Sequence, residues 1–225
     1  WYGYVQDKLP KFNIKQNISK NKVKHKIAII GGGIMGVSTA YNLLKHEKNI
    51  CLIDRLQPNS QASGSNAGSL HVQLLSYDFD PNNLTQLDNM KTLLKLQKKA
   101  VSEWKDIEEE TKSNFEISYD GGLMFAENEK DLEKLNMKIE VEQSVGVNSQ
   151  LINQDQIHKI NPLFSDKMIY AGYCPSEGKI NPLKATNSIF ENCKENGLND
   201  YCDDLIQAIE KKSGKFTIIT DNHEI

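Results

Sequence analysis

The chain has 225 residues, of which 38% are hydrophobic and 25% charged, as is usual for folded globular domains and not for disordered chains. Its net charge of -3 gives it no general attraction for polyanions, so nucleic acid is not an expected partner. The chain has no apolar run long enough for a transmembrane segment and no recognisable signal peptide, so we expect a cytoplasmic protein.

The first part of the chain is basic. Residues 1–25 hold six lysines against a single acid and show no hydrophobic period, which predicts a solvated basic arm. The chain begins with Trp1 instead of methionine, so we expect its natural start to be missing. The four cysteines are scattered without metal-ligand spacing, which predicts reduced structural thiols and no metal site.

A strand, a helix and a second strand follow the arm. Residues 26–30 form a short apolar run, typical of a parallel strand that is buried on both faces. Residues 34–46 place apolar side chains at helical spacing, and residues 50–53 form another apolar run. Such a unit within about thirty residues predicts a right-handed parallel crossover, and hence an α/β fold.

The chain then departs from the simple alternation of strand and helix. Residues 61–69 are small and polar, which is typical of a loop. A long helix follows, with its apolar face formed by Leu84, Leu87, Met90, Leu94, Val101, Trp104 and Ile107.

The next segments predict an inserted domain of α+β structure. Residues 115–119 alternate in hydrophobicity, two glycines can form a turn, and residues 123–126 return, which predicts a β-hairpin. Residues 131–146 predict another helix and residues 168–174 another strand.

The last segments predict a return to the first domain. Residues 181–182 combine a capping asparagine with a proline at the first helical position, and Gly197 ends that helix. Residues 205–209 and 215–220 alternate around a Lys-Ser-Gly turn and predict a hairpin. Residues 223–225 begin a strand that we expect to be an unpaired edge of a truncated chain.

The most specific motif is a glycine-rich turn between the first predicted strand and helix. Gly31, Gly33 and Gly36 fit G-x-G-x-x-G, in which the glycines allow a tight turn, close approach of a pyrophosphate and close helix packing. Asp54 ends the second strand, where a carboxylate can accept hydrogen bonds from an adenosine ribose. The pattern predicts FAD or NAD, and an acid at this position disfavours a 2′-phosphorylated dinucleotide.

Small and hydroxyl residues in the segment Gln61–His71 could follow a ribityl chain, which NAD lacks, although by composition this segment could equally be a flexible loop. With the glycine motif, the Ile53-Asp-Arg55 run and the Cys174–Pro182 run, this segment resembles the D-amino-acid-oxidase-like family of FAD-dependent oxidoreductases. That family includes glycine and sarcosine oxidases, D-amino-acid dehydrogenases and opine oxidases. The resemblance extends from about Lys26 to Ile225 and favours the opine-oxidase-like branch.

The resemblance implies a Rossmann-like FAD-binding domain, an interleaved substrate domain, and a full-length protein that is longer than this chain. It implies that the backbone of Ile206 meets the adenine. The whole implied cofactor set is Gly31, Gly33, Ile34, Met35, Gly36, Asp54, Arg55, Ser63, Gly64, Ser65, Asn66, Ala67 and Ile206.

The resemblance also implies hydride transfer from the carbon beside an amine nitrogen to the flavin. An amino-acid substrate needs a cation to bind its carboxylate, but Arg55 is the only arginine and belongs to the adenosine end. His71 is the single candidate catalytic residue, and a histidine with a purely structural hydrogen bond is the alternative. The remaining catalytic residues are expected outside this sequence.

We therefore divide the chain into a basic arm (1–25), an FAD-binding part with the long helix (26–111), part of a substrate domain (112–180) and a truncated return to the FAD-binding domain (181–225). The leading hypothesis is an FAD-dependent oxidoreductase acting on an amino acid or a related secondary amine. The alternatives are an NAD-dependent dehydrogenase and a non-catalytic dinucleotide-binding subunit. The expected partners are a small-molecule substrate and, in the opine-oxidase-like branch, a further subunit or electron acceptor.

Overall fold

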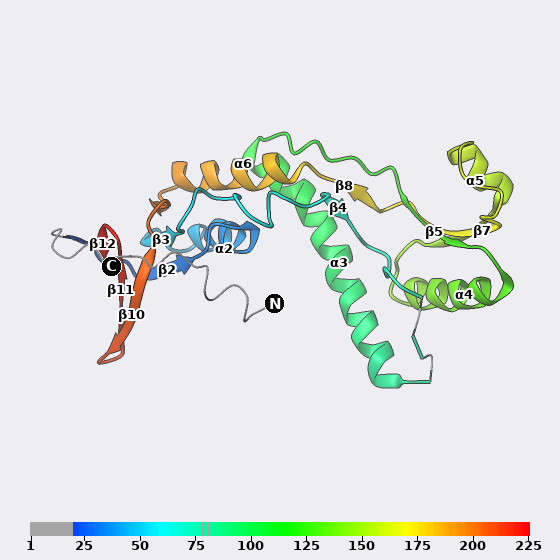
Figure 1. Ribbon diagram of the computed structural model, residues 1–225, viewed down its shortest axis with the longest axis horizontal. Helices are drawn as coiled ribbons and strands as arrows, with labels where there is room; N and C mark the ends of the chain where they lie inside the picture. Colours follow the sequence, from blue (N-terminus) through cyan, green and yellow to red (C-terminus); the bar gives the residue numbers. More distant parts are fainter. Residues whose placement is uncertain (1–19, 78, 81) are drawn as a thin grey trace, which may run out of the picture. The chain divides into compact units, whose positions relative to one another are not determined.

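The computed structural model describes residues 20–77, 79–80 and 82–225 (Figure 1). Most of the predicted basic arm, residues 1–19, therefore lies outside the described residues. The chain divides into two compact units. The first unit combines Trp1–Ser60 with Phe190–Ile225, and the second unit is Gln61–Ile189.

The first unit contains the predicted crossover. Strand β2 (Ile27–Ile30), helix α2 (Ile34–Leu44) and strand β3 (Ile50–Ile53) follow one another, and β9 (Asn199–Tyr201) completes a parallel sheet in the order β2-β3-β9. All four residues of the central strand β3 are buried. The expectation that the first strand is buried on both faces is wrong, because only Ile29 of β2 is buried and Ile30 is 54% exposed.

A second sheet in the first unit has the order β1-β12-β11-β10. Strands β10 (Ile206–Lys212) and β11 (Lys215–Thr220) form the predicted antiparallel hairpin. The connecting Ser213 and Gly214 both have positive φ, +52° and +77°, as a tight turn that follows the strand twist requires.

The prediction of an unpaired last strand is wrong. Strand β12 (His223–Glu224) pairs with β11 on one side and lies parallel to β1 (Asn21–Lys22) on the other. Part of the described end of the basic arm, residues 20–25, is thus a β-strand. The sequence did not predict this strand, because its polar and charged residues show no apolar pattern. Strand pairing uses backbone groups, so two polar residues at a sheet edge can join it without an apolar pattern.

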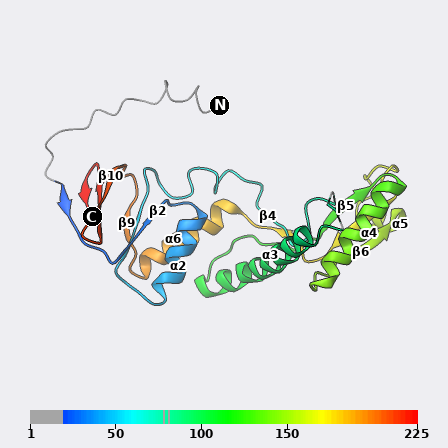
Figure 2. The same cartoon turned by 90° about the horizontal axis from the view of Figure 1, so that it is seen from below.

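Helix α6 (Pro182–Glu195) begins and ends as its sequence predicts. The Asn181 side chain accepts hydrogen bonds from the amides of Leu183 and Lys184, at 3.1 and 3.2 Å, and Gly197 beyond its end has φ +100°. The second half of α6 lies along α2 (Figure 2), where the buried Cys193 thiol is 3.9 Å from the Val37 carbonyl.

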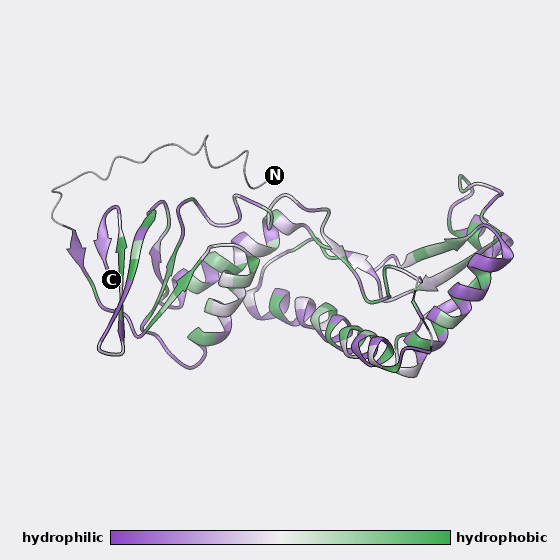
Figure 3. Ribbon diagram, turned by 60° about the horizontal axis from the view of Figure 1, so that its bottom comes forward, coloured by the Kyte–Doolittle hydropathy of each residue, from purple (hydrophilic) through white to green (hydrophobic). Residues whose placement is uncertain are grey.

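In the second unit, β4 (Ser69–Leu70) pairs with β8 (Gly178–Lys179), and α3 (Leu84–Thr111) is the predicted long helix. Apolar and polar stripes alternate along α3 (Figure 3). Leu94 and Val101 of the predicted apolar face are buried, but Leu84 is 74% exposed. The other residues of the predicted apolar face, Leu87, Met90, Trp104 and Ile107, are half-buried.

The rest of the second unit is a three-stranded sheet between two helices. Strands β5 (Gly122–Ala126), β7 (Tyr170–Cys174) and β6 (Gln150–Asn153) are antiparallel neighbours in that order. Helices α4 (Glu129–Ser144) and α5 (Gln154–Ile160) cover opposite faces (Figure 1). Leu135 and Ile139 of α4 pack on one face, and Ile157 of α5 packs on the other.

The predicted hairpin between residues 115–119 and 123–126 is wrong. The partner of β5 is β7, and Ser118 instead makes an isolated bridge to Lys179. Glu116 has φ +56°, a value that interrupts an extended strand. The alternating hydrophobicity of residues 115–119 indicates an extended segment, but it carries no information about which strand pairs with that segment.

Among the residues that the structure describes, no helix is both long and apolar enough to span a membrane.

Candidate functional site

The glycine motif lies between β2 and α2 as predicted. Gly31 has φ +109°, and its amide donates to the Ile53 carbonyl at 2.8 Å. A Cβ on Gly36 would lie 1.8 Å from the Gly31 carbonyl oxygen. These two positions therefore require glycine, one for its backbone angle and the other for the close approach of α2 to the turn.

The start of α2 has the form of an anion site. Gly33 is its N-cap, with extended backbone and no side chain that could cap the helix. The amides of a first helical turn and the positive end of the helix dipole favour negative charge at such a position. Met35 is 81% exposed. The residues present here therefore fit a phosphate group.

Asp54 has a role that the sequence did not predict. Its Oδ2 accepts a hydrogen bond from the Gly32 amide at 2.6 Å, and its Oδ1 accepts one from the Leu56 amide at 2.9 Å. The carboxylate thus fixes the glycine turn to the end of β3. A carboxylate oxygen has a second acceptor position, so each oxygen can still receive a ribose hydroxyl, and the residue fits its predicted partner.

The segment after Asp54 packs against the glycine turn. The Asn59 amide donates to the Gly32 carbonyl at 3.0 Å, and a Cβ on Gly32 would be 3.2 Å from the Cα of Pro58. Asn59 is buried with φ +66°. Sequence reasoning did not predict these contacts, because the motif template leaves Gly32 unspecified and does not extend to Pro58 and Asn59.

Two further predicted residues belong to the first unit. Arg55 is exposed directly after Asp54. Ile206 begins β10 opposite Thr220 and packs against the buried cluster of Cys51, Ile53 and Ile218. The strand directly after α6 is β9, which the sequence analysis missed because Asn199–Tyr201 has only one apolar residue.

The predicted flavin-lining residues 63–67 belong to the second unit. Asn66 fixes their loop from within, since its Nδ2 donates to the carbonyls of Ala62 and Ser63 and its Oδ1 accepts from the Gly68 amide. Ser65, Asn66 and Ala67 are exposed. The side chain of Asn66 is therefore already used inside the loop.

Gly68 ties this loop to a distant part of the second unit. Its φ is +69°, and a Cβ there would lie 2.0 Å from the Ile180 carbonyl oxygen. The Ile180 amide donates to the Gly68 carbonyl at 2.8 Å, next to the β4–β8 pair. Substitution of Gly68 is thus excluded by both space and backbone angle.

His71 follows β4 and lies beside a buried carboxylate. Its Nδ1 is 3.5 Å from Glu177 Oε2, with the histidine side chain 39% exposed and the glutamate side chain 7% exposed. Glu177 also accepts hydrogen bonds from the amides of Val72 and Gln73, at 2.9 and 3.0 Å. In the sequence analysis, Glu177 appears only as part of the Cys174–Pro182 run that carries the family resemblance.

The polar network continues to α4. Gln73 Nε2 donates to Glu177 Oε2 at 3.0 Å, and Lys138 Nζ donates to Gln73 Oε1 at 2.8 Å. Lys138 Nζ is also 2.7 Å from Glu142 Oε1, which accepts from the Leu74 amide at 2.7 Å. The side chains of Lys138 and Glu142 are fully buried.

The cysteines have the character expected of structural thiols. Cys51, Cys174 and Cys193 are buried, and all four cysteines are free. Burial raises the pKa of Cys51 and of Cys193 to about 12, so both stay protonated at neutral pH and are poor nucleophiles.

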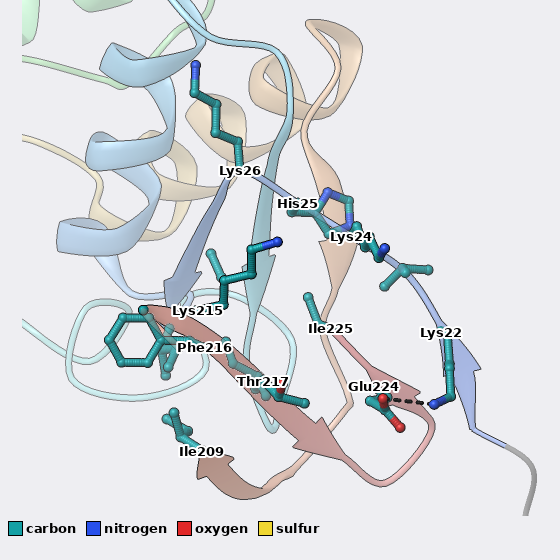
Figure 4. A pocket seen from close by; sticks show the side chains of 15 residues that line it. Lys22, Lys24, His25, Lys26, Ile209, Lys215, Phe216, Thr217, Glu224 and Ile225 are labelled. Atoms are coloured by element: carbon teal, nitrogen blue, oxygen red, sulfur yellow. Dashed lines mark hydrogen bonds and ion pairs between the residues drawn. The ribbon is translucent and has the colours of Figure 1, made fainter. Parts of the chain in front are cut away.

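A groove of about 950 Å³ also lies in the first unit, beside β2 (Figure 4). Apolar side chains from β2 and from the β10–β11 hairpin line it, together with lysines, of which Lys22 pairs with Glu224 at 3.0 Å. Its lining includes none of the predicted cofactor residues. The groove is therefore separate from the glycine turn.

Comparison with known proteins gives a consistent set of matches. The family model described as DAO, FAD dependent oxidoreductase, matches residues 26–225. Among curated proteins, glycerol 3-phosphate dehydrogenase of Caloramator mitchellensis is 27% identical over 199 residues, which cover 87% of this chain. Mitochondrial sarcosine dehydrogenase of Mus musculus is 25% identical over 205 residues, which cover 84% of this chain.

Among solved structures, L-proline dehydrogenase from P. horikoshii matches 90% of this chain with a TM-score of 0.77 and 22% identity. At that identity the likeness shows the fold alone. The chain spans 38% of the length of the first curated relative, 21% of the second, and 50% of the proline dehydrogenase chain.

Proposed function

The chain belongs to the DAO family of FAD-dependent oxidoreductases, and from that premise we propose that it binds FAD and oxidises the C–N bond of an amino acid or a related secondary amine. The observation that carries the cofactor part is the turn between β2 and α2. There Gly31 has a positive φ, Gly36 has no room for a side chain, and Asp54 holds the turn to β3. The family uses FAD, and this displaces the NAD alternative of the sequence analysis.

In this proposal the first turn of α2 faces the pyrophosphate of FAD, with Gly33 leaving space for it. Asp54 binds the adenosine ribose, and Ile206 meets the adenine through its backbone. Residues 63–67 run beside the isoalloxazine end, where Asn66 keeps their loop in one conformation. FAD supplies the electron acceptance, and the protein supplies orientation and electrostatics.

The amine substrate is favoured by the similarity to sarcosine dehydrogenase, whose name gives a secondary amine. Glycerol 3-phosphate oxidation is a second candidate, because the first curated relative carries that name. The two differ in the bond that is oxidised, C–N in one and C–O in the other. A phosphorylated substrate would also require a cluster of cationic donors, whereas the single carboxylate of an amino acid can be bound by one cation.

The experiment has two stages. The purified chain is incubated with FAD and separated from free cofactor by gel filtration, and its absorbance is recorded. We expect wild type and Met35→Ala to retain flavin, and Gly36→Ala to lose it because of the clash with the Gly31 carbonyl. If Gly36→Ala retains flavin as wild type does, the glycine turn is not the binding site.

The second stage follows bleaching of the bound flavin without oxygen. Sarcosine, L-proline, glycine and glycerol 3-phosphate are added separately. Bleaching by amines alone supports the proposal, and bleaching by glycerol 3-phosphate alone supports the second candidate. Flavin that stays oxidised with every compound supports the non-catalytic subunit of the sequence analysis. The cytoplasmic location, the domain boundaries and a partner subunit stay predictions.

A further inference from the structure

We propose that Glu177 is a positioning residue that holds the proton of neutral His71 on Nδ1, so that Nε2 of the same ring accepts the proton of the substrate ammonium group. This inference rests on the proposed amine oxidation for its last step only. The positioning itself follows from hydrogen bonds within the second unit.

The acceptor positions of Glu177 are accounted for. Its Oε1 accepts from the amides of Val72 and Gln73, and its Oε2 accepts from Gln73 Nε2. A carboxylate offers about four acceptor positions. His71 Nδ1, 3.5 Å from Oε2, is the fourth contact. Since the carboxylate only accepts, this contact is a hydrogen bond only when Nδ1 carries the hydrogen.

Lys138, at the α4 end of the network, fixes the donor and acceptor roles in the hydrogen bonds between it and His71. Lys138 has donors only, so Gln73 must turn its carbonyl oxygen toward Lys138 and its amide nitrogen toward Glu177. Glu177 is then left with an acceptor for His71. The Gln73 side chain cannot reverse without leaving the buried Lys138 without this acceptor, which is costly in a buried site.

The fold makes space for this carboxylate. A Cβ on Gly122 of β5 would lie 2.1 Å from Glu177 Oε2, so glycine at this position allows the carboxylate to sit beside the strand. The charges facing the network are those of Glu177, Lys138 and Glu142. Burial, and to a smaller extent the two carboxylates, raise the pKa of Cys174, so its thiol adds no charge.

The two buried carboxylates and one ammonium leave the network one negative charge in excess. An imidazolium at His71 balances that charge, and its 39% exposed side chain lets the proton leave to water. In the proposed step, the N–H bond of the substrate ammonium breaks and a bond from hydrogen to Nε2 forms. The nitrogen keeps the electron pair that it needs before hydride can leave the neighbouring carbon.

The test is the tautomer of His71 in the chain as it exists. Long-range ¹H–¹⁵N spectra of ¹⁵N-histidine-labelled protein distinguish Nδ1–H from Nε2–H in neutral imidazole, and His71→Gln assigns the signal. We expect Nδ1–H in the wild type. An Nε2–H tautomer in the wild type would overturn the proposal without any variant.

Two variants test whether Glu177 sets the tautomer. In Glu177→Gln an amide nitrogen replaces the acceptor that faces Nδ1, so the ratio of Nδ1–H to Nε2–H should fall by on the order of 10-fold or more. Gly122→Ala should act in the same direction by displacing the carboxylate. The proposal fails if the tautomer ratio stays at the wild-type value in Glu177→Gln while the amide spectrum shows a folded protein.

The control is a second histidine–carboxylate pair in the same unit. His158 Nε2 is also 3.5 Å from a carboxylate oxygen, that of Asp166, whose side chain is 92% exposed. Asp166→Asn should leave the tautomer of His71 unchanged. A change equal to that in Glu177→Gln would mean that loss of any carboxylate shifts the ratio, and would contradict the positioning role.

The proton-accepting step is tested separately in FAD-loaded protein. His71→Gln should retain FAD and lower kcat/KM for an amine by about 10²- to 10⁴-fold. Retained FAD with unchanged kcat/KM would overturn the step. Loss of FAD binding in the wild type itself would overturn the proposed function and leave the tautomer result standing.

Discussion

Removing one partner of the fully buried ion pair on α4 should strongly destabilise the second unit. Lys138 and Glu142 are one helical turn apart, their charged atoms are 2.7 Å apart, and neither side chain is exposed. Lys138→Met leaves the Glu142 carboxylate buried without its counter-charge. Breaking such a pair costs about 3 to 5 kcal/mol, a large part of the stability of a typical domain.

The double substitution Lys138→Met with Glu142→Gln should be milder than Lys138→Met alone. It removes both charges, and the introduced glutamine side chain keeps an acceptor for the Leu74 amide. The remaining loss is the hydrogen bond that Lys138 donates to Gln73 Oε1. A buried group without a hydrogen-bond partner costs about 1 to 3 kcal/mol. The two substitutions are therefore expected to be strongly non-additive.

The assay is urea unfolding followed by circular dichroism, with the free energy of unfolding compared among wild type, the single variants and the double variant. Lys99→Met is the matched control. Lys99 also pairs with a residue four positions later, Glu103, but at 3.5 Å with side chains 74% and 53% exposed, and such pairs contribute about 0.2 to 1 kcal/mol. Equal losses in Lys99→Met and Lys138→Met, or additive losses in the double variant, would refute the reasoning.

Three further outcomes are expected. Gly36→Ala should lower the midpoint of thermal unfolding as well as flavin retention, whereas Met35→Ala should change neither; equal midpoints for both variants would show that the turn can adjust. For Asp204, burial opposes ionisation, but hydrogen bonds from the side chains of Thr220 and His223 and from the Asn222 backbone amide hold its pKa below the ordinary 3.8. Its stabilising contribution is therefore present above pH 3.8 and lost as the pH falls further, so Asp204→Asn should be less stable at pH 7 and show a flatter acid limb of unfolding. In native protein at pH 8, Cys51 and Cys193 should resist alkylation and react only after urea is added, as counted by mass spectrometry.

The glycine turn could be predicted from the sequence because its signal is local. Gly31 needs a positive φ and Gly36 needs the absence of a side chain, and both demands fall on residue types that a motif records. The start of α6 at residues 181–182 was predictable for the same reason, since its cap lies in the same few residues.

The partners of strands were not predictable from the sequence, because pairing depends on contacts between distant segments. The alternation of residues 115–119 suggested a neighbouring strand, whereas β5 pairs with β7 about fifty residues later. Strand β1 was concealed by the lysines around it, and its parallel partner β12 lies at the opposite end of the described chain.

Part of the polar network of the second unit could have been predicted from the sequence of α4. Lys138 and Glu142 follow Leu135 and Ile139 at helical spacing, so the two charges fall on the buried stripe of α4. A charged residue on such a stripe predicts a buried partner. The identity of the partners at Gln73 and Glu177 depends on the tertiary structure and could not be read from one segment.

The discontinuous first unit affects the order of events during synthesis. Its β2 and β3 leave the ribosome well before β9 to β12, which follow only after the whole of Gln61–Ile189. At about 5 to 20 residues per second the interval is roughly 6 to 26 s. During this interval β3 lacks its neighbour β9. In the finished sheet all four residues of β3 are buried. The second unit, which is continuous in the sequence, can fold during that interval, and a chaperone that binds apolar strands would act on the first.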